Sequence, residues 1–320
     1  MTSKTLVQVK HVSKEFKVKK RFFSSTSKSQ ATVKAVRGVS FDVFEGETLG
    51  VIGESGCGKT TLGRILVQLI SASEGEINYS GIPEGMFRQK VQMIFQDPYS
   101  ALDPRMSIYR SLEEPLRIAN KLTPEERLYL VRSMLEQVGM DPEDMERYPR
   151  SFSGGQLQRI CIARTLLTNP MLVVCDEVVS ALDVSIQSQI LNLLNELKLR
   201  NQLTYVFISH NMSVIQHMSD RIAVMYFGSV VELGTKQAVF ERARHPYTQI
   251  LMSAVPQVSA KRAEIKPPLV TGELPKSTDE IQGCAFQSRC PYATAICAEQ
   301  NPALLSQEEG HFVACHHPLD

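Results

Sequence analysis

A glycine-rich turn between two regular elements constrains this fold most. Residues 53–60 read Gly-Glu-Ser-Gly-Cys-Gly-Lys-Thr, with an apolar run at 48–52 before them and an amphipathic helical pattern after them. Further short apolar runs alternate with helical patterns along the chain, and such alternation predicts a parallel sheet with helices packed on it. The expected strands are 48–52, 90–95, 171–175 and 205–209, and the expected helices include 153–168 and 184–200.

The glycine-rich turn carries the residue types that bind nucleotide phosphates. Glycines let backbone N–H groups close around a phosphate, and the start of the following helix adds partial positive charge. Lys59 can reach the β- and γ-phosphates, and the Thr60 hydroxyl can ligate Mg²⁺. The expected nucleotide-binding residues of the turn are Gly53, Glu54, Ser55, Gly56, Cys57, Gly58, Lys59, Thr60 and Thr61.

Paired carboxylates end a second apolar strand. Residues 171–175 are followed by Asp176 and Glu177. An acidic pair at a strand end is more often an ordinary surface pair, but a phosphate loop upstream favours a catalytic interpretation. We expect Asp176 to hold Mg²⁺ through water and Glu177 to polarise the attacking water as general base.

Residues 152–156, Phe-Ser-Gly-Gly-Gln, resemble the signature sequence of the ABC ATPase superfamily. Physically this is a second helix start that can meet an anion. The resemblance implies that this segment completes the nucleotide site of the opposite subunit in a head-to-tail dimer. Its residues are Ser153, Gly154, Gly155 and Gln156.

Other family elements follow in the expected order. Gln96 resembles the Q-loop glutamine, which senses Mg²⁺ and contacts the transmembrane partner, and His210 resembles the switch histidine of the γ-phosphate. Phe16 is a candidate to stack on adenine, although an aromatic residue there is more often part of the core. The segment that resembles the D-loop consists of Ser180, Ala181, Leu182 and Asp183.

The resemblance implies an α/β fold, an ABC ATPase core with a RecA-like mixed sheet, an antiparallel β part and a helical signature subdomain at about 106–168. We expect this nucleotide-binding domain to occupy residues 1–255 and a small cysteine-rich extension to occupy 256–320. The Lys- and Ser-rich stretch 17–34 is expected to form an exposed loop.

Several segments also resemble the ATPases of dipeptide and oligopeptide importers. They include the run after Gln96, Arg-Tyr-Pro at 147–149 and His-Pro-Tyr-Thr at 245–248. The long insertion before Val36 favours the F-type subunit. The family implies an ATPase that energises peptide import at the cytoplasmic face of the inner membrane, as a heterodimer with a paralogous ATPase. Its further partners would be two transmembrane permease subunits and an extracytoplasmic peptide-binding protein.

The composition and the set of motifs bear on the alternative classes of protein. The formal net charge of +1 gives no sign of nucleic-acid binding, and no apolar run approaches the roughly 18 residues that span a bilayer. A soluble ABC ATPase of DNA repair or translation usually carries a coiled-coil or zinc insertion or two tandem cores. A non-catalytic regulatory subunit would not need Lys59, Asp176, Glu177 and His210 together. Import of metal chelates or oligosaccharides stays open.

The seven cysteines fall into two groups. Cys161 and Cys175 are expected to be buried fillers. Cys57 also fits a small buried position, but Lys59 and the nearby helix start predict a thiolate that reacts with maleimide.

The last four cysteines form a separate group with the spacing C-x5-C-x6-C-x17-C. This spacing matches neither common zinc modules nor ferredoxin runs, so tetrahedral Zn²⁺ and a four-cysteine cluster both remain possible. The family resemblance favours a [4Fe–4S] cluster over zinc. The ligands would be Cys284, Cys290, Cys297 and Cys315, with His311, His316 or His317 able to replace one.

Overall fold

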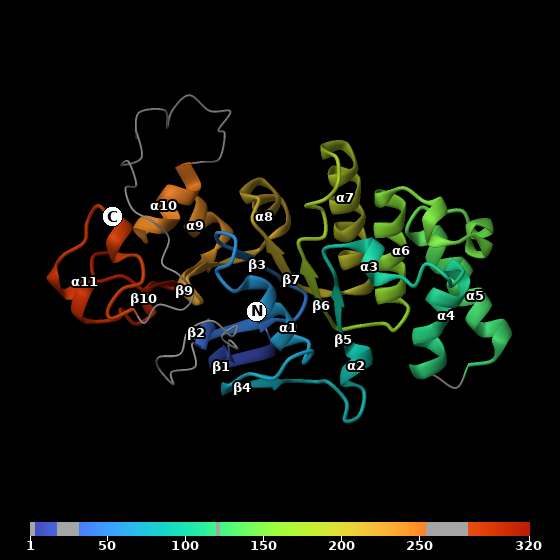
Figure 1. The fold of residues 1–320 in the computed structure, drawn as a ribbon, viewed down its shortest axis with the longest axis horizontal. Coiled ribbons are helices and arrows are strands. Elements are labelled where there is room, and N and C mark those ends of the chain that lie inside the picture. The colour runs from blue at the N-terminus through green and yellow to red at the C-terminus, as the bar shows by residue number, and fades with distance from the viewer. Residues whose placement is uncertain (1–3, 18–31, 120–121, 254–280) are drawn as a thin grey trace, which may run out of the picture. The chain divides into compact units, whose positions relative to one another are not determined.

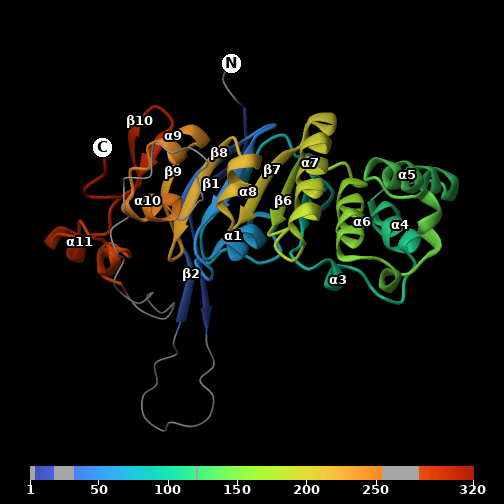
Figure 2. The ribbon, with the colours of Figure 1, turned by 90° about the horizontal axis from the view of Figure 1, so that it is seen from above.

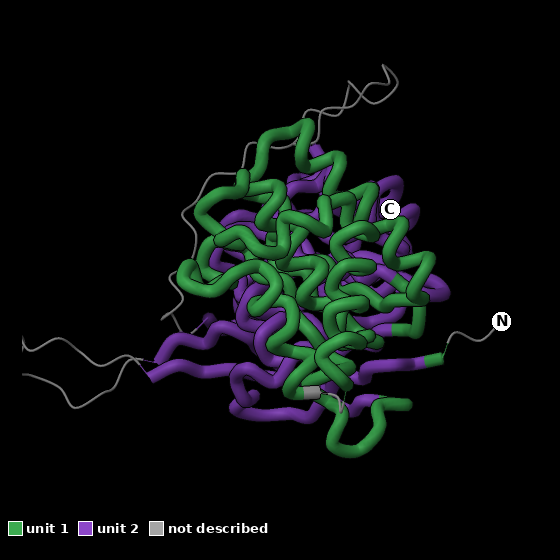
Figure 3. Tube along the Cα trace, turned by 90° about the vertical axis from the view of Figure 1, so that its right-hand side faces the viewer, with its two compact units in different colours: residues 1–4, 44–47, 80–207 green, residues 5–43, 48–79, 208–320 purple. Residues whose placement is uncertain are grey.

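The computed structural model describes residues 4–17, 32–119, 122–253 and 281–320. The chain divides into two compact units, shown in different colours in Figure 3. Unit 1 comprises residues 1–4, 44–47 and 80–207, and unit 2 comprises residues 5–43, 48–79 and 208–320. Each unit is described by itself.

Unit 2 contains two groups of strands. In one, the order is β2-β1-β4, and Figure 2 shows the ends of β1 and β2 projecting together. In the other, the order is β10-β11-β9-β8-β3, with β3 parallel to β8 and the other neighbours antiparallel. The bounds are β1 (Thr5–Lys17), β2 (Thr32–Phe44), β3 (Thr48–Ile52), β4 (Glu74–Tyr79), β8 (Arg221–Tyr226), β9 (Ser229–Thr235), β10 (Leu305–Glu308) and β11 (His311–Val313).

The helices of unit 2 connect these strands. Helix α1 (Lys59–Leu66) begins directly after the glycine-rich turn that leaves β3, and it buries Leu62, Ile65 and Leu66. The other helices are α8 (Met212–Met218), α9 (Lys236–Glu241), α10 (Pro246–Ser253) and α11 (Ala295–Glu299). Figure 1 shows α11 and β10 in the final part of the chain, coloured red. The C-terminal residues are therefore folded, and β11 pairs with β9.

Unit 1 holds the strands β7, β6 and β5 in that order. Strands β5 (Val91–Ile94) and β6 (Leu172–Asp176) are parallel, with Ile94 opposite Cys175. Every residue of β6 and of β7 (Thr204–Ser209) is buried, as expected for strands covered on both faces. This register brings the segments that follow β5 and β6 to the same edge of unit 1.

The helices of unit 1 include a group of three in which α4, α5 and α6 contact one another (Figure 1). A complete capping box starts α5, with Thr123 and Glu126 exchanging side-chain and backbone hydrogen bonds, and Gly139 follows the end of the helix with φ +71°. The bounds are α2 (Phe87–Lys90), α3 (Pro98–Ala101), α4 (Ile108–Ala119), α5 (Pro124–Gln137), α6 (Gly154–Leu166) and α7 (Val184–Asn201).

The strands and helices expected from the sequence are present, with ends that differ by a few residues. The sequence analysis did not predict β4, β8, β9, β10 or β11. Strands β4 and β10 are largely polar, whereas β8 is a buried apolar run that was overlooked. Most of the loop expected at 17–34, and most of the segment from 256 to 280, lie outside the described residues. Among the helices that the structure describes, none is both long and apolar enough to cross a membrane.

Candidate functional site

The phosphate loop is built on two close backbone approaches. A Cβ atom on Gly53 would lie 2.1 Å from the carbonyl oxygen of Met225 on β8, and one on Gly58 would lie 2.1 Å from that of Ala35. Gly58 also has φ +103°, which side-chain-bearing residues rarely adopt. Only glycine fits at these two positions, so the pairing of β3 with β8 determines the path of the loop.

Lys59 lies inside this loop. Its side chain is 5% exposed, and Nζ donates hydrogen bonds to the carbonyl oxygens of Gly53 at 2.7 Å and Glu54 at 3.0 Å. Thr60 and Thr61 belong to the first turn of α1. A buried ammonium group at a helix start, surrounded by a glycine turn, has the chemistry of a site for nucleotide phosphates.

Gln96 and Glu177 meet in unit 1, as the register of β5 and β6 requires. Gln96 Nε2 donates to Glu177 Oε2 at 3.1 Å and to Ser180 Oγ at 3.3 Å. Ser180 Oγ donates in turn to the Glu177 carbonyl at 2.9 Å, and Glu177 itself has φ +49°. Asp176 is 3% exposed at the end of β6. Gln96, Glu177 and Ser180, the residues expected to be the Q-loop glutamine, the general base and the first D-loop residue, thus form one hydrogen-bonded network.

The signature segment forms the expected helix start. Ser153 Oγ accepts a hydrogen bond from the Gln156 N–H, and Gln156 Oε1 accepts one from the Ser153 N–H. A hydroxyl that accepts a bond can still donate its own proton to an anion. A Cβ on Gly155 would lie 2.6 Å from a methyl carbon of Ile186, so this glycine is needed for contact with α7. Gly154 stands beside it at the first helical position.

The expected nucleotide residues are distributed over both units. The phosphate loop, Phe16 and His210 belong to unit 2, whereas Gln96, the signature segment, Asp176, Glu177 and the D-loop belong to unit 1. The Phe16 side chain is 41% exposed near the end of β1, so the ring is not part of the core. His210 is an exposed residue directly after β7. Ala181, Leu182 and Asp183 lead into α7.

Cys57 is buried, as a small filler would be, but its thiol does not have the lowered pKa that we expected. Its side chain is 6% exposed, and burial raises the pKa of its thiol, while the positive charge of Lys59 lowers it by less. Sγ lies 3.9 Å from Lys59 Nζ. The expectation of a thiolate is therefore wrong, because the loss of solvent outweighs the nearby cation.

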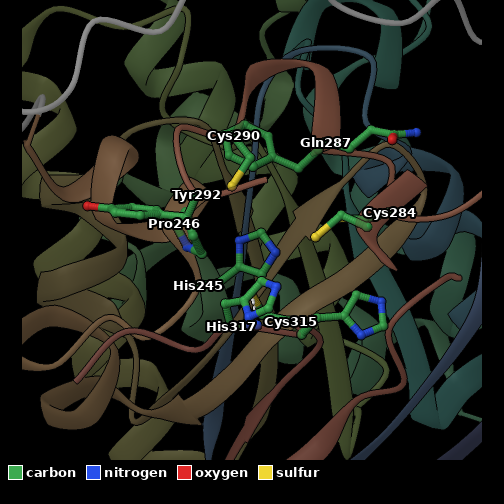
Figure 4. Close-up of a pocket in the computed structure, with 11 residues that line it drawn as sticks. His245, Pro246, Cys284, Gln287, Cys290, Tyr292, Cys315 and His317 are labelled. Atoms are coloured by element: carbon green, nitrogen blue, oxygen red, sulfur yellow. Dashed lines mark hydrogen bonds between the residues drawn. The ribbon is translucent and has the colours of Figure 1, made fainter. Parts of the chain in front are cut away.

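The four C-terminal cysteines line one pocket of unit 2. Figure 4 shows Cys284, Cys290 and Cys315 around it, and Cys297 also lines it. Burial raises the pKa of Cys284 and Cys290, and it raises that of Cys315 to about 11, with smaller contributions from the other cysteines. The backbone N–H of His317 points to Cys315 Sγ at 3.4 Å.

The side chains that line this pocket are not arranged as the ligands of a metal ion. In the described part of the chain, no group of three or more His, Cys, Asp or Glu side chains is placed to hold a metal ion. His311 lies elsewhere, where its Nε2 is 2.7 Å from Glu232 Oε1 and its side chain is buried. His316 and His317 do line the pocket. The expected iron–sulfur or zinc centre is thus unsupported by ligand geometry, although its four cysteines are gathered.

Two residues near the nucleotide loop were missed by the sequence analysis. Arg289 forms two hydrogen bonds with the Glu54 carboxylate, and the Tyr247 hydroxyl accepts one from the Glu54 N–H. Tyr247 stands in a segment that was noted only for its family resemblance, Arg289 stands beside Cys290, and no local pattern links either residue to residue 54.

Comparison with known proteins agrees with this geometry. The sequence matches the family described as ABC transporter over residues 36–180 and the family described as the C-terminal region of oligopeptide/dipeptide transporters over residues 231–297. The oligopeptide transport ATP-binding protein AppF of Bacillus subtilis (strain 168) is 45% identical over 98% of this chain and 97% of its own. The chain belongs to the ATP-binding proteins of oligopeptide/dipeptide ABC transporters.

Other relatives of this ATP-binding protein are of the same kind. The dipeptide transport ATP-binding protein DppF of Haemophilus influenzae is 46% identical over 95% of this chain and 94% of its own. Among solved structures, the ATP-binding cassette MJ0796, determined as a dimer in a post-hydrolysis state with ADP and Pi, is 26% identical. It covers 72% of this chain and 99% of its own with a TM-score of 0.62. The predicted ABC ATPase fold is confirmed.

The buried state of Cys57 in this ATP-binding protein makes a prediction about reactivity. At pH 7, maleimide should modify Cys57 much more slowly in the native than in the urea-unfolded chain, because the raised pKa leaves little thiolate. The native rate should rise about tenfold per pH unit until the pH approaches the thiol pKa. Mass spectrometry of the peptide that carries Cys57 measures this rate, with Cys57→Ser as the control. Equal rates in native and unfolded chains at pH 7 would contradict the prediction.

Proposed function

We propose that this chain is the ATP-hydrolysing subunit of an ABC importer of dipeptides or oligopeptides. The near full-length relationship to peptide-transport ATP-binding proteins supports the transport role. The contact of Gln96 with Glu177 is the single observation that carries the catalytic role, because it orients a carboxylate at the end of a buried strand. ATP binding would close a head-to-tail ATPase dimer, and hydrolysis would reopen it.

The residues of the expected nucleotide site have the chemistry to bind ATP and Mg²⁺. The glycine cradle and the buried Lys59 suit phosphate oxygens, while Thr60, Asp176 and Gln96 carry the oxygen donors that Mg²⁺ prefers and would ligate it in their expected roles. Glu177 would accept a proton from the attacking water, and Ser153 with its glycines would serve the nucleotide of the partner ATPase. Phe16 would stack on adenine and His210 would contact the γ-phosphate.

Replacing Glu177 tests the catalytic role. Glu177→Gln should retain ATP binding but lower the rate of hydrolysis by about 10²- to 10⁴-fold, because the amide cannot accept the proton. Phosphate release from the assembled transporter and equilibrium binding of ATP measure the two effects. Glu196→Gln, an exposed change of the same kind on α7, should leave both unchanged. Hydrolysis at the unmodified rate in Glu177→Gln would exclude this residue as the base.

We further propose that the second ATPase is a paralogue, and that the pair acts at the cytoplasmic face of the inner membrane. It would bind two transmembrane permease subunits, which receive peptide from an extracytoplasmic binding protein. Native mass spectrometry of the detergent-extracted complex should show one copy of this chain with one different ATPase. Two copies of this chain without a paralogue would contradict the heterodimer.

The cysteine pocket is proposed to hold a [4Fe–4S] cluster on Cys284, Cys290, Cys297 and Cys315. Their convergence on one pocket and the His317 N–H directed at a sulfur support this proposal. A bound cluster would join the turn between Cys284 and Cys290, helix α11 with Cys297 and the segment after β11 with Cys315. Because the free thiols have raised pKa values, binding would release protons and weaken as the pH falls.

Metal analysis tests the cluster. Chain purified without oxygen should be brown and contain about four irons, and Cys315→Ala should lower the iron content, because a four-cysteine site loses a ligand. Cys161→Ala, which removes a buried cysteine of unit 1, should keep it unchanged. Stoichiometric zinc without iron would replace the cluster by a zinc site, and the absence of both metals would overturn the metal site itself.

A further inference from the structure

A residue between two of the pocket cysteines reaches the phosphate loop. Arg289 Nη1 donates to Glu54 Oε2 at 2.9 Å, and Nη2 donates to Glu54 Oε1 at 3.0 Å. The two side chains are only 12% and 27% exposed. Two parallel hydrogen bonds fix the orientation of the guanidinium relative to the carboxylate, whereas a single ion pair only brings the opposite charges together.

Glu54 is held at its main chain as well. Its N–H donates to the hydroxyl of the fully buried Tyr247 at 3.0 Å, and its carbonyl oxygen accepts from Lys59 Nζ at 3.0 Å. The second residue of the phosphate loop is therefore bound at three points. Two of them are supplied by the C-terminal part of unit 2, from α10 and from the turn that carries Arg289.

The position of Arg289 is set by the chain between Cys284 and Cys290. The Cys284 carbonyl accepts from Gln287 N, and the Phe286 carbonyl accepts from Arg289 N, which forms a short 3-10 turn at Gln287–Arg289. Figure 4 shows Gln287 of this turn between the labelled Cys284 and Cys290. Arg289 therefore shares one short hydrogen-bonded turn with these two cysteines.

Aromatic packing anchors this turn beside the loop. Phe286 is 1% exposed, and its ring lies edge-on to Tyr226 with the centroids 5.2 Å apart. The Tyr247 ring is 5.5 Å from Phe286 and 4.6 Å from Tyr226. The Arg289 guanidinium lies 5.8 Å from the Tyr226 centroid, so the same cluster supports the arginine.

We propose that Arg289 is a positioning residue of the nucleotide site, which links the turn between Cys284 and Cys290 to the phosphate loop. This inference rests on the proposed binding of ATP at that loop. Arg289 acts in two ways. It orders Glu54 before ATP arrives, which lowers the entropy lost on binding, and it neutralises a carboxylate that would otherwise repel the incoming phosphates.

These two effects predict a distinctive set of affinities. Arg289→Ala should weaken ATP binding about tenfold, equivalent to about 1.4 kcal/mol, because it frees the loop and leaves the Glu54 charge uncompensated. Adding Glu54→Gln to this variant should restore part of the affinity by removing that charge. Arg289→Lys should fall between Arg289→Ala and the unmodified chain, because lysine supplies charge without the two-point contact. A role limited to folding would give no recovery in the double variant.

The control is a second C-terminal arginine. Arg242 pairs with Glu308 at 3.1 Å, and the Arg242 side chain is exposed. Arg242→Ala removes the same charge without touching Glu54, so its ATP affinity should match that of the unmodified chain. Thermal unfolding of each full-length variant then separates a loss of folding from a loss of positioning.

Hydrogen exchange tests the link without nucleotide. In the ATP-free chain, peptides covering residues 53–60 should exchange faster in Arg289→Ala and in Cys290→Ser than in Arg242→Ala, because the Glu54 N–H loses its fixed geometry. Unchanged exchange in both variants, or ATP affinity in Arg289→Ala equal to that of Arg242→Ala, would overturn the proposal. If instead the proposed ATP binding at this loop is wrong, the unmodified chain and Lys59→Ala should have the same affinity for ATP.

Discussion

The hydrogen bonds from the buried Lys59 ammonium to the carbonyl oxygens of Gly53 and Glu54 organise the nucleotide loop. A cation this deeply buried must be paired with oxygen atoms, so both carbonyls turn inward. That turn is possible only because Gly53 can pass close to the carbonyl of Met225 without a Cβ. The loop thus depends on β8, a strand about 170 residues later in the sequence, as much as on its own glycines.

The orientation of the Glu177 carboxylate, the expected general base, likewise depends on a hydrogen bond from a segment that is distant in the sequence. The parallel register of β5 and β6 puts Gln96 within reach of Glu177, and Ser180 closes the network. Because the Gln96 amide donates to both the Glu177 carboxylate and the Ser180 hydroxyl, a displacement of the segment after β5 would disturb the hydrogen bond that orients Glu177. The site is therefore sensitive to whatever contacts that segment.

The C-terminal region extends the core and also contacts the nucleotide loop. Strand β11 pairs with β9, and the aromatic cluster of Tyr226, Tyr247 and Phe286 joins β8, α10 and the cysteine region. Three buried aromatic rings give this region an apolar contact that four cysteines alone would not provide. The boundary expected at residue 255 is therefore crossed by packing.

The sequence by itself indicated the glycine-rich turn before a helix, the paired carboxylates after an apolar strand, the helix start at 153–156 and the buried strands 48–52, 171–175 and 205–209. Each of these depends on the spacing and type of neighbouring residues, and so can be recognised without coordinates. It did not determine that burial outweighs Lys59 in setting the pKa of the Cys57 thiol, because the extent of burial depends on atoms from distant segments. Only the tertiary structure decided that Arg289 and Tyr247 hold Glu54, since hydrogen bonds across some 190 and 235 positions leave no periodic trace in the sequence.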